Sequence, residues 1–472
     1  MTKLAVVGAG LAGLAAARRL EQLDPGADVW VYEAQGRVGG VVRSEPPHGG
    51  AAGMEAGPDS LLARKPAALA LIQAVALDRE VVPSHPGAKG ALLYLGGRLL
   101  PIPAGVVAGV PLLPERLADA AVLSPEGRAA VLADLSASAE ALVGDVSLGG
   151  FLERRLGREW LDHVASPLLS GIYAGHVRDL SLLATYPELA DAARQGSLIR
   201  GLAAQRAAHP PAPGPMFVTL ASGLEALPRE VARQLRRPVR LAAPVASVVR
   251  AGRRYRLRGR GGLDEVVDGV VLATPAWVAA RQLAALAPAA VPLLEGVPYA
   301  NLAVVVARFP VGVSVPPGMT GILAPAGSGV ALTAVTFVGQ KWAHRAPLPD
   351  VPVRIFYGRA AAESGEPSPD DDVLAWSDGR FRQQVADDLR QVLGWGADPL
   401  ALAVHRHPAT MPQYRVGHRE RVERLEALVR GMPGLALAGA AYHGVGIPDV
   451  IADGERAAAQ VVQSLSTSGR AP

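Results

Sequence analysis

A glycine-rich turn near the start of the chain constrains the fold more than any other feature of the 472-residue sequence. Residues 8–13 spell G-A-G-L-A-G and follow a short apolar run, 3–7, with the character of a buried strand. The next stretch, 11–23, has apolar residues at helical spacing. A G-x-G-x-x-G motif between a strand and a helix is typical of a dinucleotide-binding unit. The chain is therefore predicted to begin with a Rossmann-like half-unit.

Each glycine of this motif has its own task at a bound dinucleotide. Gly8 permits the tight turn, Gly10 lets the backbone approach a pyrophosphate, and Gly13 lets the helix pack on the strand. The helix N-terminus supplies N–H groups and a partial positive charge for phosphates. Glu33 follows the second predicted strand, 27–32, where its carboxylate would accept hydrogen bonds from ribose hydroxyls and repel a 2′-phosphate.

The composition excludes several classes of protein. The chain has no cysteine, which rules out disulfides, thiolate catalysis, and zinc or iron–sulfur sites held by cysteine. The formal net charge is only +4 and aromatic residues make up 4%, so few side chains could stack on single-stranded nucleic acid. We therefore expect no nucleic-acid partner.

The sequence also bears on where the protein works. The N-terminus lacks the pattern of a secretory signal, which predicts a cytoplasmic protein. The charge-free run 311–340 is long enough to cross a bilayer, but prolines and glycines interrupt it, which predicts buried strands and turns instead. The proline-containing region 101–114 is predicted to be helical. It is apolar enough to contact a membrane or a partner enzyme.

The rest of the chain divides into segments of different character. Residues 91–205 have mainly helical spacing, and the proline-rich run 209–215 is predicted to be a linker. Strands are predicted at 239–249, 254–258 and 268–273, an antiparallel sheet across 299–356, and a strand, glycine loop and helix across 434–462.

A second pair of glycines follows Glu33 almost at once. Gly39 and Gly40 let the backbone run against a long, flat ligand, and Arg37 and Arg43 flank them with positive charge. This carboxylate followed by R-x-G-G resembles the flavoprotein amine oxidase and carotenoid desaturase superfamily. The resemblance implies that the segment lies along the diphosphate and ribityl chain of FAD.

Further segments resemble the protoporphyrinogen and coproporphyrinogen oxidases. They are G-P-D-S at 57–60, P-L-L-S-G-I-Y-A-G at 167–175 with 180–185, M-P-Q-Y-R-V-G-H at 411–418, and G-A-A-Y-H-G-V-G-I-P-D at 439–449. The chain departs from the family pattern at His407, in a segment where relatives tend to carry tryptophan, and at Val450, where many carry cysteine.

The last of these segments also has a physical interpretation. Gly439, Gly444 and Gly446 let the loop fold tightly, and Pro448 suits the first turn of the helix that follows. If the pyrimidine edge of a flavin lies at this loop, the helix N-terminus would stabilise the negative charge gained on reduction.

The resemblance implies an α/β fold with a discontinuous, Rossmann-like FAD-binding domain, a mixed α+β substrate domain, and a helical subdomain that could face a membrane. The expected boundaries are 1–60, 217–283 and 426–472 for the FAD-binding domain, 61–83 and 284–425 for the substrate-binding domain, and 84–212 for the helical subdomain.

The activity that the resemblance implies is the oxygen-dependent oxidation of coproporphyrinogen III to coproporphyrin III in haem biosynthesis, with three O2 reduced to three H2O2. Coproporphyrinogen is preferred because Asp59 and the pair Arg64-Lys65 resemble the bacterial branch. Protoporphyrinogen IX is the alternative substrate. An amine oxidase or carotenoid desaturase, and a non-catalytic flavin-binding protein, stay open, and a ferrochelatase is a candidate partner.

The expected site residues follow from the motifs and the resemblance. Arg64 and Lys65 are predicted to bind substrate propionates, with Gly175 also at the substrate and Asp59 near it. No residue is assigned as a general acid or base, and no metal site is expected, although His405 and His407 alternate on a predicted strand. The predicted FAD-binding residues are Gly8, Ala9, Gly10, Leu11, Ala12, Gly13, Glu33, Ala34, Arg37, Gly39, Gly40, Val41, Arg43, Gly57, Pro58, Asp59, Ser60, Val245, Thr274, Gly439, Val445, Gly446 and Ile447.

Overall fold

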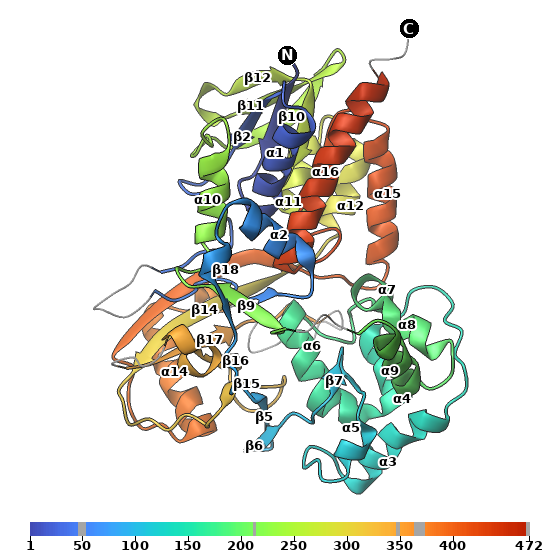
Figure 1. Ribbon diagram of the computed structural model, residues 1–472, viewed down its shortest axis with the longest axis vertical. Helices are drawn as coiled ribbons and strands as arrows, with labels where there is room; N and C mark the ends of the chain where they lie inside the picture. The colour runs from blue at the N-terminus through green and yellow to red at the C-terminus, as the bar shows by residue number, and fades with distance from the viewer. Residues whose placement is uncertain (46–52, 211–213, 346–349, 363–372, 469–472) are drawn as a thin grey trace.

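The computed structural model describes residues 1–45, 53–210, 214–345, 350–362 and 373–468. A four-stranded parallel sheet, ordered β19-β13-β1-β2, joins the beginning and the end of the chain. Figure 1 shows α1 and α16 side by side next to this sheet, with both termini at the same end of the molecule. The predicted Rossmann-like unit is therefore confirmed. Its strands are β1 (Lys3–Val7), β2 (Asp28–Tyr32), β13 (Gly269–Leu272) and β19 (Leu435–Leu437).

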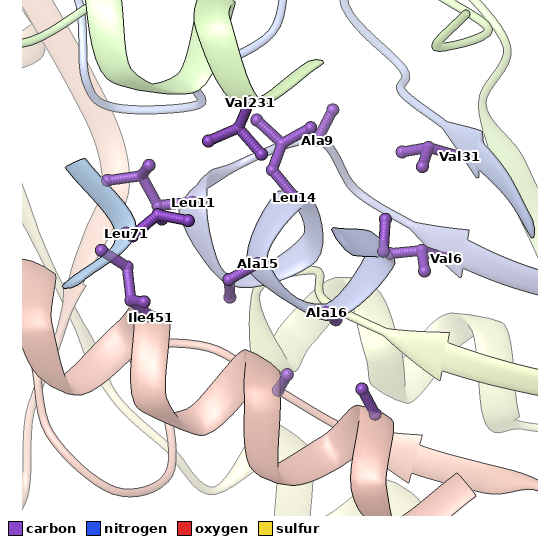
Figure 2. Close-up of a cluster of buried hydrophobic side chains, with 14 of the residues drawn as sticks. Val6, Ala9, Leu11, Leu14, Ala15, Ala16, Val31, Leu71, Val231 and Ile451 are labelled. Carbon is purple, nitrogen blue, oxygen red and sulfur yellow. The ribbon is translucent and has the colours of Figure 1, made fainter. Parts of the chain in front are cut away.

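Small residues bring α1 and α16 into close contact. A Cβ on Gly454 of α16 would lie only 2.1 Å from the carbonyl oxygen of Ala12 in α1. Figure 2 shows Leu11, Leu71 and Ile451 converging from α1, α2 and α16, and all three are buried. This apolar packing fixes the start of α1 relative to α16. The helices on this face are α1 (Leu11–Leu23), α2 (Pro66–Ala74), α10 (Ala226–Gln234) and α16 (Ile447–Ser468).

The opposite face of the parallel sheet packs against a small antiparallel sheet and three more helices. The first of its strands begins at Val245, later than predicted, because Ala242 takes a positive φ of 50° that ends the extended backbone before it. These elements are β10 (Val245–Ala251), β11 (Arg254–Gly259), β12 (Asp264–Val267), α11 (Ala276–Leu283), α12 (Val291–Glu295) and α15 (His418–Arg430).

A seven-stranded sheet, ordered β18-β14-β17-β16-β15-β5-β6, forms a second body with α14 packed against it. Most neighbours are antiparallel, as predicted for 299–356, but β5 pairs parallel with β15. The helical prediction is therefore wrong for residues 91–101, which form strands β5 and β6 of this sheet and the turn between them. The strands are β5 (Gly90–Leu95), β6 (Arg98–Pro101), β14 (Tyr299–Phe309), β15 (Met319–Leu323), β16 (Leu332–Phe337), β17 (Val351–Tyr357) and β18 (Ala401–Pro412), with α13 (Val338–Lys341) and α14 (Asp378–Leu393).

Short helices between 114 and 208 build a third body, at the lower right of Figure 1, with its own apolar core. The segment 101–114 that precedes them is not helical, because prolines and glycines favour the small hairpin β7 (Val106–Val107) and β8 (Val110–Pro111). The helices are α3 (Pro125–Ala133), α4 (Leu148–Leu156), α5 (Arg158–Trp160), a π-helical turn (Leu161–Ala165), α6 (Ser166–Tyr173), α7 (Leu182–Thr185), α8 (Pro187–Ala193) and α9 (Leu198–Ala208).

A further three-stranded sheet, with β9 (Phe217–Leu220) between β3 (Leu61–Leu62) and β4 (Val81–Pro83), links the first two bodies. Part of the predicted linker, residues 211–213, lies outside the described residues. Among the helices described, none combines the length and the apolar character needed to cross a bilayer.

Candidate active site

The turn after β1 packs tightly at two of its glycines and is open at the third. Gly8 has a φ of +103°, and a Cβ on it would lie 2.6 Å from the carbonyl oxygen of Ala273. A Cβ on Gly13 would lie 1.9 Å from the carbonyl oxygen of Gly8. Gly10 instead has nothing within 4 Å of its Cβ position, and it gives α1 no side-chain cap. The start of α1 therefore fits the diphosphate of a dinucleotide such as FAD.

Glu33 is buried at the end of β2, next to this turn. Its two carboxylate oxygens accept hydrogen bonds from the N–H groups of Ala9, at 2.7 Å, and Gln35, at 2.8 Å. The neighbouring Ala34 is exposed. The carboxylate is thus held in place at the turn, and its contact with a ribose stays a prediction.

The second glycine pair lies directly against the first motif. The N–H of Gly39 donates to the carbonyl oxygen of Ala9 at 2.8 Å, and a Cβ on Gly40 would lie 3.5 Å from the Cα of Gly10. The two glycine turns therefore form one continuous surface, as a long ligand requires. Val41 and Arg43, from the same segment, are exposed.

Arg37 makes several hydrogen bonds within the loop that carries the second glycine pair. Its guanidinium donates to the carbonyl oxygens of Val38, at 3.1 Å, and Val42, at 3.2 Å, and also to that of Gly40. These bonds hold the loop in shape, because one guanidinium connects three of its carbonyl oxygens. Arg37 therefore shapes the loop, and its contact with FAD stays a prediction.

The G-P-D-S segment, residues 57–60, packs against the loop that carries the second glycine pair. A Cβ on Gly57 would lie 2.0 Å from the carbonyl oxygen of Val41, so only glycine fits there. Pro58 follows, and Ser60 donates its hydroxyl to Asp59 at 3.0 Å. Segments 8–13, 39–43 and 57–60 are thus brought together, and their shared contact with FAD stays a prediction.

Asp59 is held as a carboxylate by two cations. Lys341 donates to its two oxygens at 2.8 and 2.9 Å, and Arg354 lies at 3.0 Å. Burial alone would raise the pKa of Asp59, but the two cations together hold that pKa well below its usual range. A carboxylate locked in this way is suited to shaping the segment rather than to moving a proton.

The C-terminal glycine loop is anchored on both sides. Asp453 accepts hydrogen bonds from the N–H of Gly439, at 2.8 Å, and from the ring of His443, at 2.7 Å. On the other side, the hydroxyl of Tyr414 donates to the carbonyl oxygen of Ala440 and accepts from the N–H of Gly444, each at 2.7 Å. The loop is therefore positioned by the helix that follows it and by the M-P-Q-Y segment.

The other loop residues predicted to bind FAD, Val445, Gly446 and Ile447, lie between the helical body and the start of α16. Val445 packs against the core of the helical body, Gly446 lies beside Asp449, and Ile447 begins α16 and packs against the core of the parallel sheet. The loop thus touches two of the three bodies.

Gly175 lies beneath Gln413 rather than on an open face. Gln413 is 2% exposed and donates to the carbonyl oxygen of Tyr173 at 2.8 Å. A Cβ on Gly175 would lie 1.9 Å from the side-chain oxygen of Gln413. The structure therefore explains this glycine by packing, and its contact with the substrate stays a prediction.

The two cations predicted to bind propionates have different surroundings. Arg64 is exposed near Tyr186, whose ring meets that of Tyr173 edge-on at 6.2 Å. Lys65 instead forms an ion pair with Asp449 of α16, at 2.6 Å. Arg64 is thus available to a ligand as it stands, whereas Lys65 already has an anionic partner.

Val245 and Thr274 are joined through Gln282 of α11. The amide of Gln282 donates to the carbonyl oxygen of Val245 at 3.0 Å, and the hydroxyl of Thr274 donates to Gln282 at 2.9 Å. Both predicted residues therefore lie around the parallel sheet, and their contacts with FAD stay predictions.

His405 and His407 are each used in local structure. His405 pairs with Glu45 at 2.6 Å, and His407 donates to the carbonyl oxygen of Ala56 at 2.8 Å. Burial lowers the pKa of His407, which keeps its ring neutral. Within the described residues, no group of three or more potential ligands could hold a metal ion.

Several residues that position the site were not singled out from the sequence. Gln413, Tyr414 and Asp449 lie within segments that resemble the porphyrinogen oxidases, so the resemblance marked their neighbourhood but not their contacts. Lys341 and Arg354 had no signal of their own, since their partner Asp59 lies 282 residues before Lys341 and still further before Arg354.

Comparisons with known proteins agree with this arrangement. A family model described as flavin containing amine oxidoreductase matches residues 11–462. Coproporphyrinogen III oxidase of Bacillus subtilis (strain 168) is 32% identical over 98% of this chain and 98% of its own. Protoporphyrinogen oxidase of Homo sapiens is 28% identical over 97% of this chain and 98% of its own.

Solved structures extend the comparison to the fold. A protein of Exiguobacterium sp. 255-15 assigned as a protoporphyrinogen oxidase superposes with a TM-score of 0.86 at 32% identity, over 98% of this chain and 99% of that one. Cyclohexylamine oxidase of Brevibacterium oxydans shares the fold alone, with a TM-score of 0.69 at 18% identity over 98% and 99% of the two chains. The predicted α/β fold class and the expectation of FAD as cofactor are both confirmed, whereas a membrane-facing helical subdomain stays a prediction. The chain belongs to the flavin-containing amine oxidoreductase family of enzymes.

Proposed function

We propose that this protein is a coproporphyrinogen III oxidase, which removes six electrons and six protons from coproporphyrinogen III to give coproporphyrin III. Three O2 accept them and leave as three H2O2. The observation that carries the proposal is the full-length similarity, 32% over 98% of both chains, to a relative with that name. The similarity spans all three bodies of the fold and not only the dinucleotide motif.

The arrangement of the site supports this chemistry. Bound FAD would supply the redox chemistry, accepting two electrons at a time from the macrocycle. The glycine turns at Gly10 and Gly40 would hold the diphosphate part, and the loop around Gly439 the redox end. Asp59 would keep the G-P-D-S segment rigid as a bound carboxylate. The product is aromatic, so its formation favours proton loss to water without a strong base in the protein.

An anaerobic titration tests the proposal. Coproporphyrinogen III added to the FAD-loaded protein without oxygen is expected to bleach the flavin absorbance, and readmitted oxygen is expected to restore it. Protoporphyrinogen IX, the second candidate because of the human relative, is expected to bleach it more slowly. An aliphatic amine and a polyene serve as controls. Bleaching by a control alone, or by neither porphyrinogen, would reject the proposal.

Replacing Arg64 by alanine should separate the two porphyrinogens. Arg64 is exposed and free to bind a propionate bidentately, and coproporphyrinogen carries four propionates against two on protoporphyrinogen. We expect KM for coproporphyrinogen to rise about tenfold, as for loss of one charged hydrogen bond, with a smaller rise for protoporphyrinogen. Arg200→Ala, at an exposed position of α9, is the matched control and should change neither KM. Equal rises for both substrates with Arg64→Ala would contradict this role.

Two further expectations stay predictions. Contact of the region 101–114 with a membrane or with a ferrochelatase gains support from the exposed side chain of Leu113. Flotation with liposomes and co-purification with a ferrochelatase would test the two contacts separately. A cytoplasmic location is proposed from the sequence and is tested by cell fractionation.

A further inference from the structure

An ion pair joins the starts of two helices that lie 384 residues apart in the chain. Lys65 is the residue that precedes α2, and its ammonium nitrogen lies 2.6 and 2.7 Å from the two carboxylate oxygens of Asp449. Asp449 lies in the first turn of α16. The lysine side chain is 44% exposed and that of the aspartate 23%. The pair thus ties the G-P-D-S region to the helix that follows the C-terminal glycine loop.

The carboxylate of this pair lies against the loop itself. A Cβ on Gly444 would be 2.7 Å from the Cβ of Asp449, and one on Gly446 would be 2.8 Å from its Oδ2. The negative charge of Asp449 also acts on two buried tyrosines near the loop. Burial is the main cause that raises the pKa values of Tyr173 and Tyr414, and the negative charge of Asp449 adds to the rise in both.

The loop and the start of α16 form the part of the site expected to meet the flavin's redox end. A helix N-terminus carries a partial positive charge, which favours the negative charge that a flavin gains on reduction. A bare carboxylate in the first turn would oppose that effect. Lys65 supplies a compensating positive charge from outside the helix, within direct contact of the carboxylate.

We propose that Lys65 sets the reduction potential of the bound FAD by neutralising Asp449 beneath the C-terminal loop. Lys65 is in this sense a positioning residue, which acts through Asp449. The inference rests on the loop holding the flavin, and it does not depend on which substrate the enzyme oxidises.

The midpoint potential of the bound FAD, measured by dye equilibration without any porphyrinogen, tests the inference. Lys65→Met is expected to lower the potential, because it leaves the carboxylate of Asp449 unpaired, and flavin reduction becomes several-fold less favourable. Asp449→Asn is expected to raise it, because the lysine charge is then unopposed. The double variant should return close to the wild-type potential, and Lys65→Arg should keep it.

Lys3→Met provides the matched control. Lys3 pairs with Glu265 at the same distance of 2.6 Å and with similar exposure, but it begins β1 and lies at the opposite end of that strand from the glycine turn. Its replacement should leave the potential unchanged. A wild-type potential in both Lys65→Met and Asp449→Asn overturns the inference. So does a rise in KM with Lys65→Met at constant potential, which would assign Lys65 to the substrate alone. A failed porphyrinogen titration with shifted potentials would reject the proposed substrate and not this role.

Discussion

Replacing Gly13 by alanine is expected to destabilise the protein severely, even before a cofactor binds. The added Cβ would lie 1.9 Å from the backbone oxygen of Gly8, and neither β1 nor α1 can move away without disturbing the core that Figure 2 shows. We expect a loss of about 3–5 kcal/mol in the free energy of unfolding, which is the range of the most damaging single substitutions. Urea unfolding of the FAD-free protein would measure it.

Gly10→Ala is the matched control, since it changes the same motif at the open position. Nothing lies within 4 Å of its Cβ, and its φ of −71° suits any residue. The FAD-free variant should therefore unfold like the wild type, while the methyl group occupies the space meant for the diphosphate. We expect FAD affinity to fall about a hundredfold, equivalent to about 2.7 kcal/mol. Normal FAD binding by Gly10→Ala would show that the diphosphate lies elsewhere, and normal stability of Gly13→Ala would contradict the tight packing.

The N-terminal unit could be predicted from the sequence almost residue by residue. The helix predicted over 11–23 is α1, and the strand predicted over 3–7 is β1. Both carry strong local signals, because an apolar run, a glycine turn and a helical period follow one another without a gap. The position of Glu33 at the end of β2 follows from the same unit.

The strands β5 and β6 could not be predicted in the same way. Their pairing depends on β15, with Gly90 opposite Met319, so the decisive partner lies more than 200 residues away. The spacing of apolar residues in 91–101 suits a helix equally well. Pairing of β5 with β15 in the folded protein makes this segment a strand instead. The sequence has no local mark for such a choice.

The contacts of charged residues were the other part that the sequence left open. The sequence marked Asp59 and Lys65 as functional candidates. It could not show that Asp59 forms ion pairs with Lys341 and Arg354. Nor could it show that Lys65 pairs with Asp449. Ion pairs between distant segments have no required spacing, so only the fold reveals them. The positions of the glycines were easier to predict, because only glycine lets two backbone segments come this close together.

Replacing Arg354 by methionine is expected to be the second most damaging change. Arg354 is 2% exposed and donates to the carbonyl oxygens of Glu55, at 2.8 Å, and Gly57, besides its ion pair with Asp59. Methionine fills much of the volume but leaves two carbonyls without this donor and Asp59 with Lys341 alone. Breaking a buried pair from one side costs about 3–5 kcal/mol, and we expect a loss of that order in the free energy of unfolding.

A double-mutant cycle separates the ion pair from the backbone hydrogen bonds. Asp59→Asn combined with Arg354→Met should cost less than the sum of the two single changes, because either change alone already removes the ion pair between the two residues, while the two carbonyls lose their donor only with Arg354. Arg308→Met is the control, since Arg308 pairs with Asp350 at 3.1 Å on the same sheet but keeps 15% of its side chain exposed, and it should cost less. Additive effects of Asp59→Asn and Arg354→Met would show that these two charges do not stabilise each other, and Lys341 alone would then hold Asp59 as a carboxylate.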